Sequence, residues 1–270
     1  MVIFPNAKIN LGLNVLKKRT DGYHDLESVL VPIALHDILE IVPSGDGEET
    51  LETTGLKVPC LPEENLCLGV FHLLAKDFNI PAVRIHLHKV VPMGAGLGGG
   101  SSDGAGTIKI LNEIYSLGLP ASQMKDYARE TGSDCAFFID NETAFATGKG
   151  ELLEPIDVNL TGHRILIVIP PIHISTAEAY RSVIPAKPAM RIPSILKMPI
   201  EDWKDVLCND FETSVFQFHP DIRKIKEQLY SAGAVYASMS GSGAAVYGIF
   251  RDEFPVTTLF SGCITWEGKL

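Results

Sequence analysis

The sequence lacks any uninterrupted apolar run close to the roughly 18 residues that a membrane-spanning helix needs. Residues 1–12 also lack the basic-then-apolar pattern of a secretory signal peptide. Both absences predict a protein without a membrane span, and we expect it to be cytoplasmic.

Cysteine is scarce and scattered along the chain. There are five, and no two have Cys-x-x-Cys spacing: Cys60, Cys67, Cys135, Cys208 and Cys263. An odd number without such spacing predicts reduced, mostly buried thiols and not a disulfide framework. His86 and His88 share one face of a predicted strand, but no third ligand has suitable spacing. We therefore expect no metal site there.

Positive charge is in deficit. Lysine and arginine number 23 against 33 acidic residues, which gives a net charge of −10. This balance disfavours nucleic acid and anionic membranes as partners, because both attract basic surfaces. It does not exclude a phosphorylated small molecule, since a bound divalent cation can offset the charge of its phosphates. We expect a small-molecule partner, and either a monomer or a weak homodimer.

The length of 270 residues and the apolar content of 46% suffice for one large domain or two ordinary ones. A polar, glycine-containing turn at residues 146–151 resembles the end of a first domain. We therefore expect an N-terminal domain at residues 1–152 and a C-terminal domain at residues 153–270.

Hydrophobic periodicity outlines the elements of both halves. Alternation and short apolar runs predict strands at residues 2–4, 11–16, 28–35, 38–42, 83–89, 164–169, 235–239, 244–250 and 263–266. Helical spacing and capping residues predict helices from the 61–65 segment to about residue 79, at residues 122–131, after residue 175, and at residues 220–232. The mixture favours an α+β fold.

The most informative stretch is residues 92–103, Pro-Met-Gly-Ala-Gly-Leu-Gly-Gly-Gly-Ser-Ser-Asp. It joins the predicted strand at 83–89 to a helix whose apolar face includes Ala105, Ile108 and Leu111. Glycines let a ligand approach the backbone, and a helix N-terminus attracts phosphate. We expect Ser101, Ser102 or Asp103 to cap that helix. The stretch is therefore interpreted as a phosphate cradle, and the alternative is a merely flexible connection.

Two better-known phosphate loops fit less well. A Walker A loop ends in Gly-Lys-Ser/Thr, whereas here Gly100 runs into Ser101. The spacing Gly-x-Gly-x-x-Gly of residues 94–99 matches the dinucleotide fingerprint, which also needs a second parallel strand with an acidic residue. The segment that follows is helical in pattern, so the dinucleotide interpretation is disfavoured.

Two charged residues outside this stretch have candidate chemical roles. Lys8 lies two residues before Asn10 in an apolar strand, so both side chains are expected on one face. Lys8 is either an edge lysine that reaches solvent or a cation beside a reacting group. Asp134 follows the helix-ending Gly132 and precedes an apolar run, so it is either a helix cap or a placed acid–base group.

Together these residues carry a family resemblance. The stretch at 92–103, with Ala-Lys-Ile-Asn-Leu at 7–11 and Asp-Gly-Tyr-His at 21–24, resembles the GHMP kinase superfamily over nearly the whole chain. Within that superfamily it resembles the branch whose alcohol substrate carries a cytidyl group, in the non-mevalonate pathway to isoprenoid precursors. The resemblance implies an α+β, two-domain fold. That fold has a ribosomal-protein-like N-terminal nucleotide domain, a ferredoxin-like C-terminal domain, and an active site in the cleft between them.

The resemblance also implies ATP and Mg²⁺ as cofactors and assigns roles to residues. Lys8 and Asp134 become catalytic, with Asp134 as general base; Cys135 and Ala136 replace the usual Val-Pro after it. The implied nucleotide contacts are Asn65, Lys89, Pro92, Met93, Gly94, Ala95, Gly96, Leu97, Gly98, Gly99, Gly100, Ser101 and Ser102. Asn65 is equally suited to cap the helix that follows it.

The implied acceptor contacts are Asn10 together with three ring-bearing residues, Tyr23, His24 and Tyr180. A core position stays open for His24 and Tyr180. The Ser-Gly-Ser-Gly turn at 240–243 is either a plain hairpin turn or a second phosphate-facing loop. The alternatives to the cytidyl substrate are another GHMP kinase, such as homoserine or mevalonate kinase, and a non-catalytic nucleotide-binding regulator.

Overall fold

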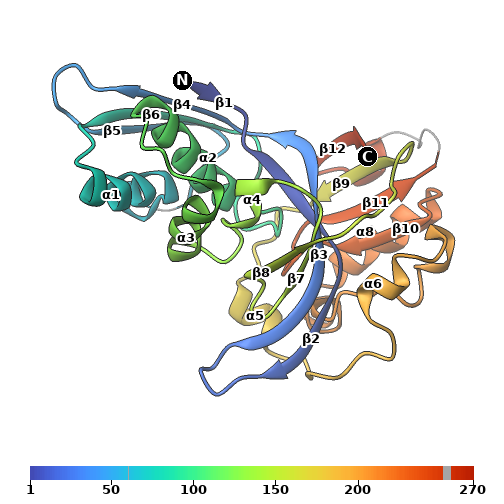
Figure 1. The fold of residues 1–270 in the computed structure, drawn as a ribbon. Coiled ribbons are helices and arrows are strands. Elements are labelled where there is room, and N and C mark those ends of the chain that lie inside the picture. Colours follow the sequence, from blue (N-terminus) through green and yellow to red (C-terminus); the bar gives the residue numbers. More distant parts are fainter. Residues whose placement is uncertain (60, 252–256) are drawn as a thin grey trace. The chain divides into compact units, whose positions relative to one another are not determined.

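The computed structural model describes residues 1–59, 61–251 and 257–270, and its contacts group the chain into two compact units (Figure 1). Unit 1 comprises Met1–Ala7, Leu35–Met93 and Gly98–Glu142, and unit 2 comprises Lys8–Ala34, Gly94–Leu97 and Thr143–Leu270. Each unit is thus built from interleaved segments. The predicted division into 1–152 and 153–270 stays a prediction, and the hairpin around residue 150 lies within unit 2.

Unit 1 is a four-stranded sheet with helices on one face. The strand order is β1-β4-β6-β5, with bounds Val2–Ile3, Ile38–Pro43, Val83–Lys89 and Thr50–Gly55. The helices are α1 (Leu66–Phe78), α2 (Gly99–Ile114), α3 (Ala121–Thr131) and α4 (Phe137–Asp140), and η1 (Pro62–Glu64) precedes α1. Alternation in β4 and β6 buries Leu39, Ile41, Ile85 and Leu87, and α2 packs over this side of the sheet (Figure 1).

Unit 2 contains two four-stranded sheets. The first has the order β2-β3-β7-β8, with bounds Asn6–Lys18, His24–His36, Ala144–Thr147 and Leu152–Pro155, although the first two residues of β2 and the last two of β3 belong to unit 1. The second has the order β10-β11-β9-β12, with bounds Tyr236–Met239, Val246–Phe250, Arg164–Ile169 and Ile264–Lys269. Its antiparallel order, with helices between the strands, is ferredoxin-like.

The helices of unit 2 are short except for two. They are α5 (Thr176–Tyr180), α6 (Ile192–Ile195), α7 (Phe211–Phe218) and α8 (Pro220–Ser231), with η2 (Ile200–Asp202) and η3 (Thr257–Phe260). In α8 the proline occupies the first turn, and Ile222, Ile225 and Leu229 form the buried face, as the sequence predicts. This face packs into a core with β9 and β11.

The structure confirms the α+β class and most predicted elements. The main differences are that β2 runs from Asn6 to Lys18, beyond the predicted 11–16, and that β5, β7, β8, α4, α6 and α7 were not predicted. Among the described cysteines all four are free; Cys67 and Cys135 are buried, whereas Cys208 is exposed and Cys263 is half-buried. Cys60 lies outside the described residues. No helix in the described part of the chain is both long and apolar enough to cross a bilayer.

Candidate active site

The glycine-rich stretch ends in a helix N-terminus that no side chain caps. Gly98 is the N-cap of α2, with φ of +74°, and it provides no side-chain acceptor. The Ser102 N–H donates to the Gly98 carbonyl at 2.9 Å, so helical bonding begins there. The prediction that Ser101, Ser102 or Asp103 caps the helix is therefore wrong, because all three lie inside it. Helix geometry leaves the preceding N–H groups without intrahelical acceptors, which suits an anion.

Within unit 2, the second glycine turn packs on the first glycine stretch. The Ser240 hydroxyl donates to the Gly96 carbonyl at 2.8 Å, and the Ala245 N–H donates to the Ala95 carbonyl at 3.1 Å. A Cβ on Gly96 would lie 1.9 Å from the Ser240 carbonyl oxygen. The turn at 240–243 thus closes the predicted β10–β11 hairpin and also braces the stretch at 94–97.

Lys8 is buried beside this bracing contact. Its side chain is 3% exposed, and its ammonium donates to Asn10 Oδ1 at 2.6 Å and to the Gly96 carbonyl at 3.0 Å. The Asn10 amide donates in turn to Ser28 Oγ at 2.8 Å. The alternative of an edge lysine that reaches solvent is wrong, and the predicted common face of Lys8 and Asn10 is confirmed. The arrangement fixes one positive charge against the glycine stretch.

Lys89 is also buried, in unit 1, but among carboxylates. It is 1% exposed, and its ammonium donates to the Asp37 carboxylate and, at 2.7 Å, to Asp103 Oδ2. Burial acts to lower the pKa of Lys89, but the two carboxylates outweigh it and raise that pKa. Burial raises the pKa of Asp103 to about 7, against the opposing effect of Lys89. The ammonium is thus engaged by side chains of the protein itself.

Asp134 lies in a turn between α3 and α4. Gly132 ends α3, as predicted, and the Asp134 carbonyl accepts from the Phe137 N–H at 3.2 Å. The N-cap of α4 is Ala136, so the structure does not support a capping role for Asp134. Asp134 is half-buried, whereas the neighbouring Cys135 is buried and its thiol has a pKa raised by burial. This disfavours the thiol as a nucleophile.

Asn65 caps α1. Its Oδ1 accepts from the Cys67 N–H at 2.9 Å, and the residue is 7% exposed. The structure thus confirms the capping role that the sequence offered as one of two alternatives. Contact with a nucleotide base stays a prediction for Asn65, as contact with the nucleotide does for Lys89.

Unit 2 brings together two of the three rings predicted to bind the acceptor. His24 stacks on Tyr180 with ring centres 4.5 Å apart, and Tyr180 meets Phe211 edge-on at 4.7 Å. Tyr23 is 61% exposed, and the Lys149 ammonium lies 4.8 Å from its ring centre. Because His24 and Tyr180 are both half-buried, neither is a plain core residue. The three rings stay partly accessible to a ligand.

Sequence reasoning missed several residues that hold these groups. Asp37 is one, although its position between two apolar strands could have drawn attention. Another is Ser28, which accepts from Asn10 and donates to the Gly12 carbonyl at 2.6 Å. Sequence reasoning also missed the pair of Glu178, in α5, and His219, whose Nε2 lies 2.8 Å from Glu178 Oε1, although no contact of this pair with a site residue is seen among the described residues. No sequence pattern links residues this far apart in the chain.

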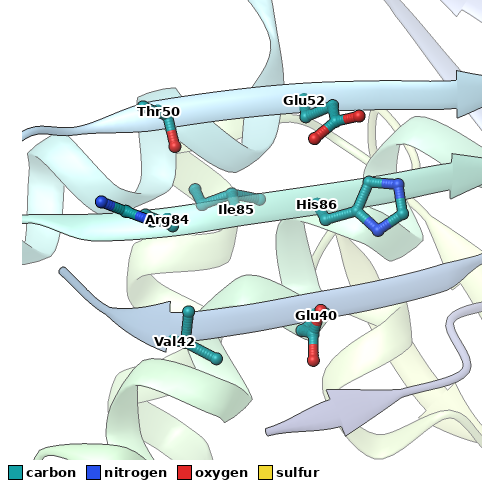
Figure 2. A pocket seen from close by; sticks show the side chains of 7 residues that line it. All are labelled: Glu40, Val42, Thr50, Glu52, Arg84, Ile85 and His86. Carbon is teal, nitrogen blue, oxygen red and sulfur yellow. The ribbon is translucent and has the colours of Figure 1, made fainter.

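A surface depression of about 320 Å³ lies elsewhere in unit 1, on the sheet face formed by β4, β5 and β6. Figure 2 shows His86 on the middle strand between Glu40 and Glu52. The residues that line the depression are Glu40, Val42, Thr50, Glu52, Arg84, Ile85 and His86. None of these was predicted as a site residue. In the described part of the chain, no cluster of three or more histidine, cysteine or acidic residues could hold a metal ion.

Comparisons with known families agree with the resemblance seen in the sequence. The model of the GHMP kinases N terminal domain matches residues 65–148, and the model of the GHMP kinases C terminal region matches residues 192–260. The first match contains the glycine stretch, α2 and Asp134, and the second contains α7, α8 and the turn at 240–243.

Curated relatives match over almost their full length. A 4-diphosphocytidyl-2-C-methyl-D-erythritol kinase from Bacteroides thetaiotaomicron is 47% identical, with 100% of each chain covered. One of the same name from Cytophaga hutchinsonii is 50% identical over 94% of this chain and 93% of its own length.

Solved structures extend the comparison to the fold. A crystal structure of 4-(cytidine 5'-diphospho)-2C-methyl-D-erythritol kinase matches with a TM-score of 0.84 at 30% identity, covering 99% of this chain and 98% of the other. The mevalonate kinase of Methanococcus jannaschii matches with a TM-score of 0.70 at 16% identity, over 93% of this chain and 90% of the other, which is a likeness of fold alone.

Proposed function

Because the chain belongs to the GHMP kinase family, with 4-diphosphocytidyl-2-C-methyl-D-erythritol kinases among its relatives, it is an ATP-dependent small-molecule kinase, and we propose its acceptor and its working residues. The proposed reaction is transfer of the γ-phosphoryl group of ATP to the 2-hydroxyl of 4-diphosphocytidyl-2-C-methyl-D-erythritol. This reaction serves the non-mevalonate route to isoprenoid precursors.

The observation that carries the nucleotide part of the proposal is the uncapped N-terminus of α2. Gly98, the N-cap of α2, has a left-handed conformation, and the first turn of α2 presents backbone N–H groups without a side-chain cap. Such groups hold phosphate oxygens at the positive end of the helix dipole. Phosphoryl transfer depends mostly on alignment and charge stabilisation, so this backbone arrangement suits the reaction.

Lys8 and Asp134 supply the side-chain chemistry in the proposal. Lys8 carries a fixed positive charge, held by Asn10 and the Gly96 carbonyl, which would stabilise negative charge that develops on the transferred group. Asp134 would accept the proton of the acceptor hydroxyl, or hold that hydroxyl in line for attack.

Mg²⁺ is part of the proposal, and it would neutralise the charge of the phosphates when bound. Mg²⁺ usually keeps several waters and binds substrate phosphates with only one or two protein oxygens. The described residues fit this mode, because they include the hydroxyls of Ser101 and Ser102 at the start of α2. The Ser101 or Ser102 hydroxyl would be the protein ligand.

The acceptor part of the proposal is supported by the rings of unit 2. Tyr23, His24 and Tyr180 are partly accessible, and aromatic rings bind a nucleobase by stacking. We assign the cytosine to these rings and a hydroxyl-orienting role to Asn10. The net charge of −10 disfavours a nucleic-acid partner, and the four free cysteines among the described residues support a cytoplasmic location. A monomer or weak homodimer stays part of the proposal.

The test is ADP release from MgATP with 4-diphosphocytidyl-2-C-methyl-D-erythritol as acceptor, with mevalonate and homoserine assayed in parallel. We expect turnover with the cytidyl acceptor alone. A Lys8→Ala variant should lose turnover, while Lys224→Ala, which removes an exposed lysine of the same unit, should keep most of it. Turnover with mevalonate or homoserine would mean that this compound, and not the cytidyl alcohol, is the acceptor. Tight ATP binding without turnover of any acceptor would favour a regulatory protein.

A further inference from the structure

Three ionisable side chains of unit 1 are buried together, and one of them, Lys89, is among the nucleotide contacts that the resemblance implies. Asp37, Lys89 and Asp103 are 0%, 1% and 2% exposed. We call them the buried triad. The Lys89 ammonium donates to the Asp37 carboxylate and, at 2.7 Å, to Asp103 Oδ2. Burying three ionisable groups is costly and is seldom the most stable way to fill a core, so such a triad calls for a role beyond stability.

The buried triad joins the two ends of the glycine stretch. Lys89 is the last residue of β6, and Asp103 lies in the second turn of α2. Val90 and Val91 are the first residues after β6. Their N–H groups donate to Asp37 Oδ1 at 2.6 and 2.8 Å. One ammonium therefore ties the strand that leads into the stretch to the helix that leaves it, through charge-assisted hydrogen bonds.

The first residue of α2 rests directly on this assembly. A Cβ on Gly99 would lie 3.3 Å from the Lys89 Nζ and 2.8 Å from Val91 Cγ1. The backbone at Gly99 thus packs against the ammonium and against a residue that Asp37 holds. Any shift of the buried triad would move the N–H groups of the first turn, and binding sites of this kind need placement to about 0.5 Å.

We propose that Asp37, Lys89 and Asp103 are positioning residues for the nucleotide, and that Lys89 acts through the backbone at the start of α2 and not by touching the nucleotide. The buried triad holds that turn in the geometry that accepts phosphate. The inference deepens the proposed function and rests on its ATP site, but not on the identity of the acceptor.

The test compares variants of the buried triad by calorimetric MgATP binding and by the KM values of both substrates. We expect Lys89→Met and Asp37→Asn each to weaken MgATP binding about tenfold or more, with the KM for the acceptor nearly unchanged. The double variant should bind no more weakly than Lys89→Met alone, because both changes break one assembly. Asp103→Asn, which keeps the shape of the side chain, should weaken binding several-fold. Asp126→Asn, an exposed carboxylate of α3, is the control and should change nothing.

Two results would overturn the inference. Weakened binding in Lys89→Met but not in Asp37→Asn or Asp103→Asn would mean that the lysine meets the nucleotide itself. Lower melting temperatures with unchanged MgATP binding would mean that the buried triad serves stability alone. If Lys89→Met fails to fold, the two aspartate variants decide between these outcomes. Altered MgATP binding together with no turnover of the cytidyl acceptor would support the inference while refuting the proposed acceptor.

Discussion

The start of α2 in unit 1 and the ring group in unit 2 are built on opposite principles. The first region presents backbone N–H groups, in an uncapped helix turn that rests on three buried ionisable side chains. The second region presents side chains: His24 stacks on Tyr180, and Tyr23 is 61% exposed. A phosphate chain offers the same oxygens whatever molecule carries it, so backbone N–H groups suffice to bind it. A base must be told from other bases, which takes side chains that stay accessible.

This contrast predicts different sensitivities to mutation. A backbone site tolerates most side-chain changes and fails where a glycine or a buried support is altered. A side-chain site fails with a single truncation. Residues that take part in the chemical step but not in binding should behave differently from both kinds of site, because their loss lowers kcat without changing the KM of either substrate.

The largest expected effect is that of Asp134→Asn, a change that should spare both regions. The amide cannot accept the hydroxyl proton, so we expect kcat to fall by about 10² to 10⁴-fold while MgATP binding stays near that of the wild type. Single-turnover kinetics and equilibrium binding measure the two quantities separately. Near-normal turnover would remove Asp134 from the chemistry, and lost ATP binding would place it in the nucleotide site.

Gly96→Ala tests the backbone of the glycine stretch just before α2, in a segment that belongs to unit 2. The new Cβ would lie 1.9 Å from the Ser240 carbonyl oxygen at a residue with φ of +77°, so the stretch must shift. We expect a loss of about 1–3 kcal/mol in stability and a higher KM for ATP, with the KM for the acceptor changing less. Gly47→Ala is the matched control: its φ is +79°, but nothing lies within 4 Å of its Cβ position. Equal effects from the two variants would show that backbone strain matters and the contact with Ser240 does not.

Tyr180→Leu tests the ring group of unit 2. Loss of the ring removes the stacking surface beside His24, so the KM for the cytidyl acceptor should rise about tenfold while the KM for ATP stays unchanged. Tyr180→Phe keeps the ring and should restore most of the affinity. A rise in the KM for ATP would contradict the assignment of the two substrates to the two regions.

Glu178→Gln should have the smallest effect, because its pair with His219 is partly exposed. The hydrogen bond from His219 lowers the pKa of Glu178 in the folded protein. A lowered carboxyl pKa adds stability above the ordinary value of 4.5, and this stability is lost as the pH falls below it. Melting temperatures should therefore favour the wild type at pH 6, with the difference shrinking towards pH 3. A pH-independent difference would show that shape, and not charge, holds α5.

The sequence predicts local features around the start of α2 well. Alternation gives β6 its bounds, and it places Lys89 on the same face as the buried Val83, Ile85 and Leu87. The burial of Lys89 was therefore foreseeable, although the resemblance favoured a ligand contact. The partners that permit this burial were not foreseeable, because Asp37 is 52 residues away and only the folded sheet brings it close.

The cap of α2 shows a different limit. Serine and aspartate are common caps, yet here the helix starts earlier, at Gly99, directly after Gly98 in a left-handed conformation. Propensity favours the residue that satisfies the N–H groups, whereas a phosphate site needs them unsatisfied. The interleaving of the two units was also beyond the sequence, since it depends on strand pairing between distant segments.

The position of the transferred phosphate tests the central claim most directly. The 2-carbon of the proposed acceptor bears a methyl group and no hydrogen, so a phosphate on its hydroxyl has no proton three bonds away. We therefore expect the phosphorus NMR spectrum of the product to show a new phosphomonoester singlet without coupling to protons. A phosphomonoester split by neighbouring protons, or inorganic phosphate alone, would contradict the account.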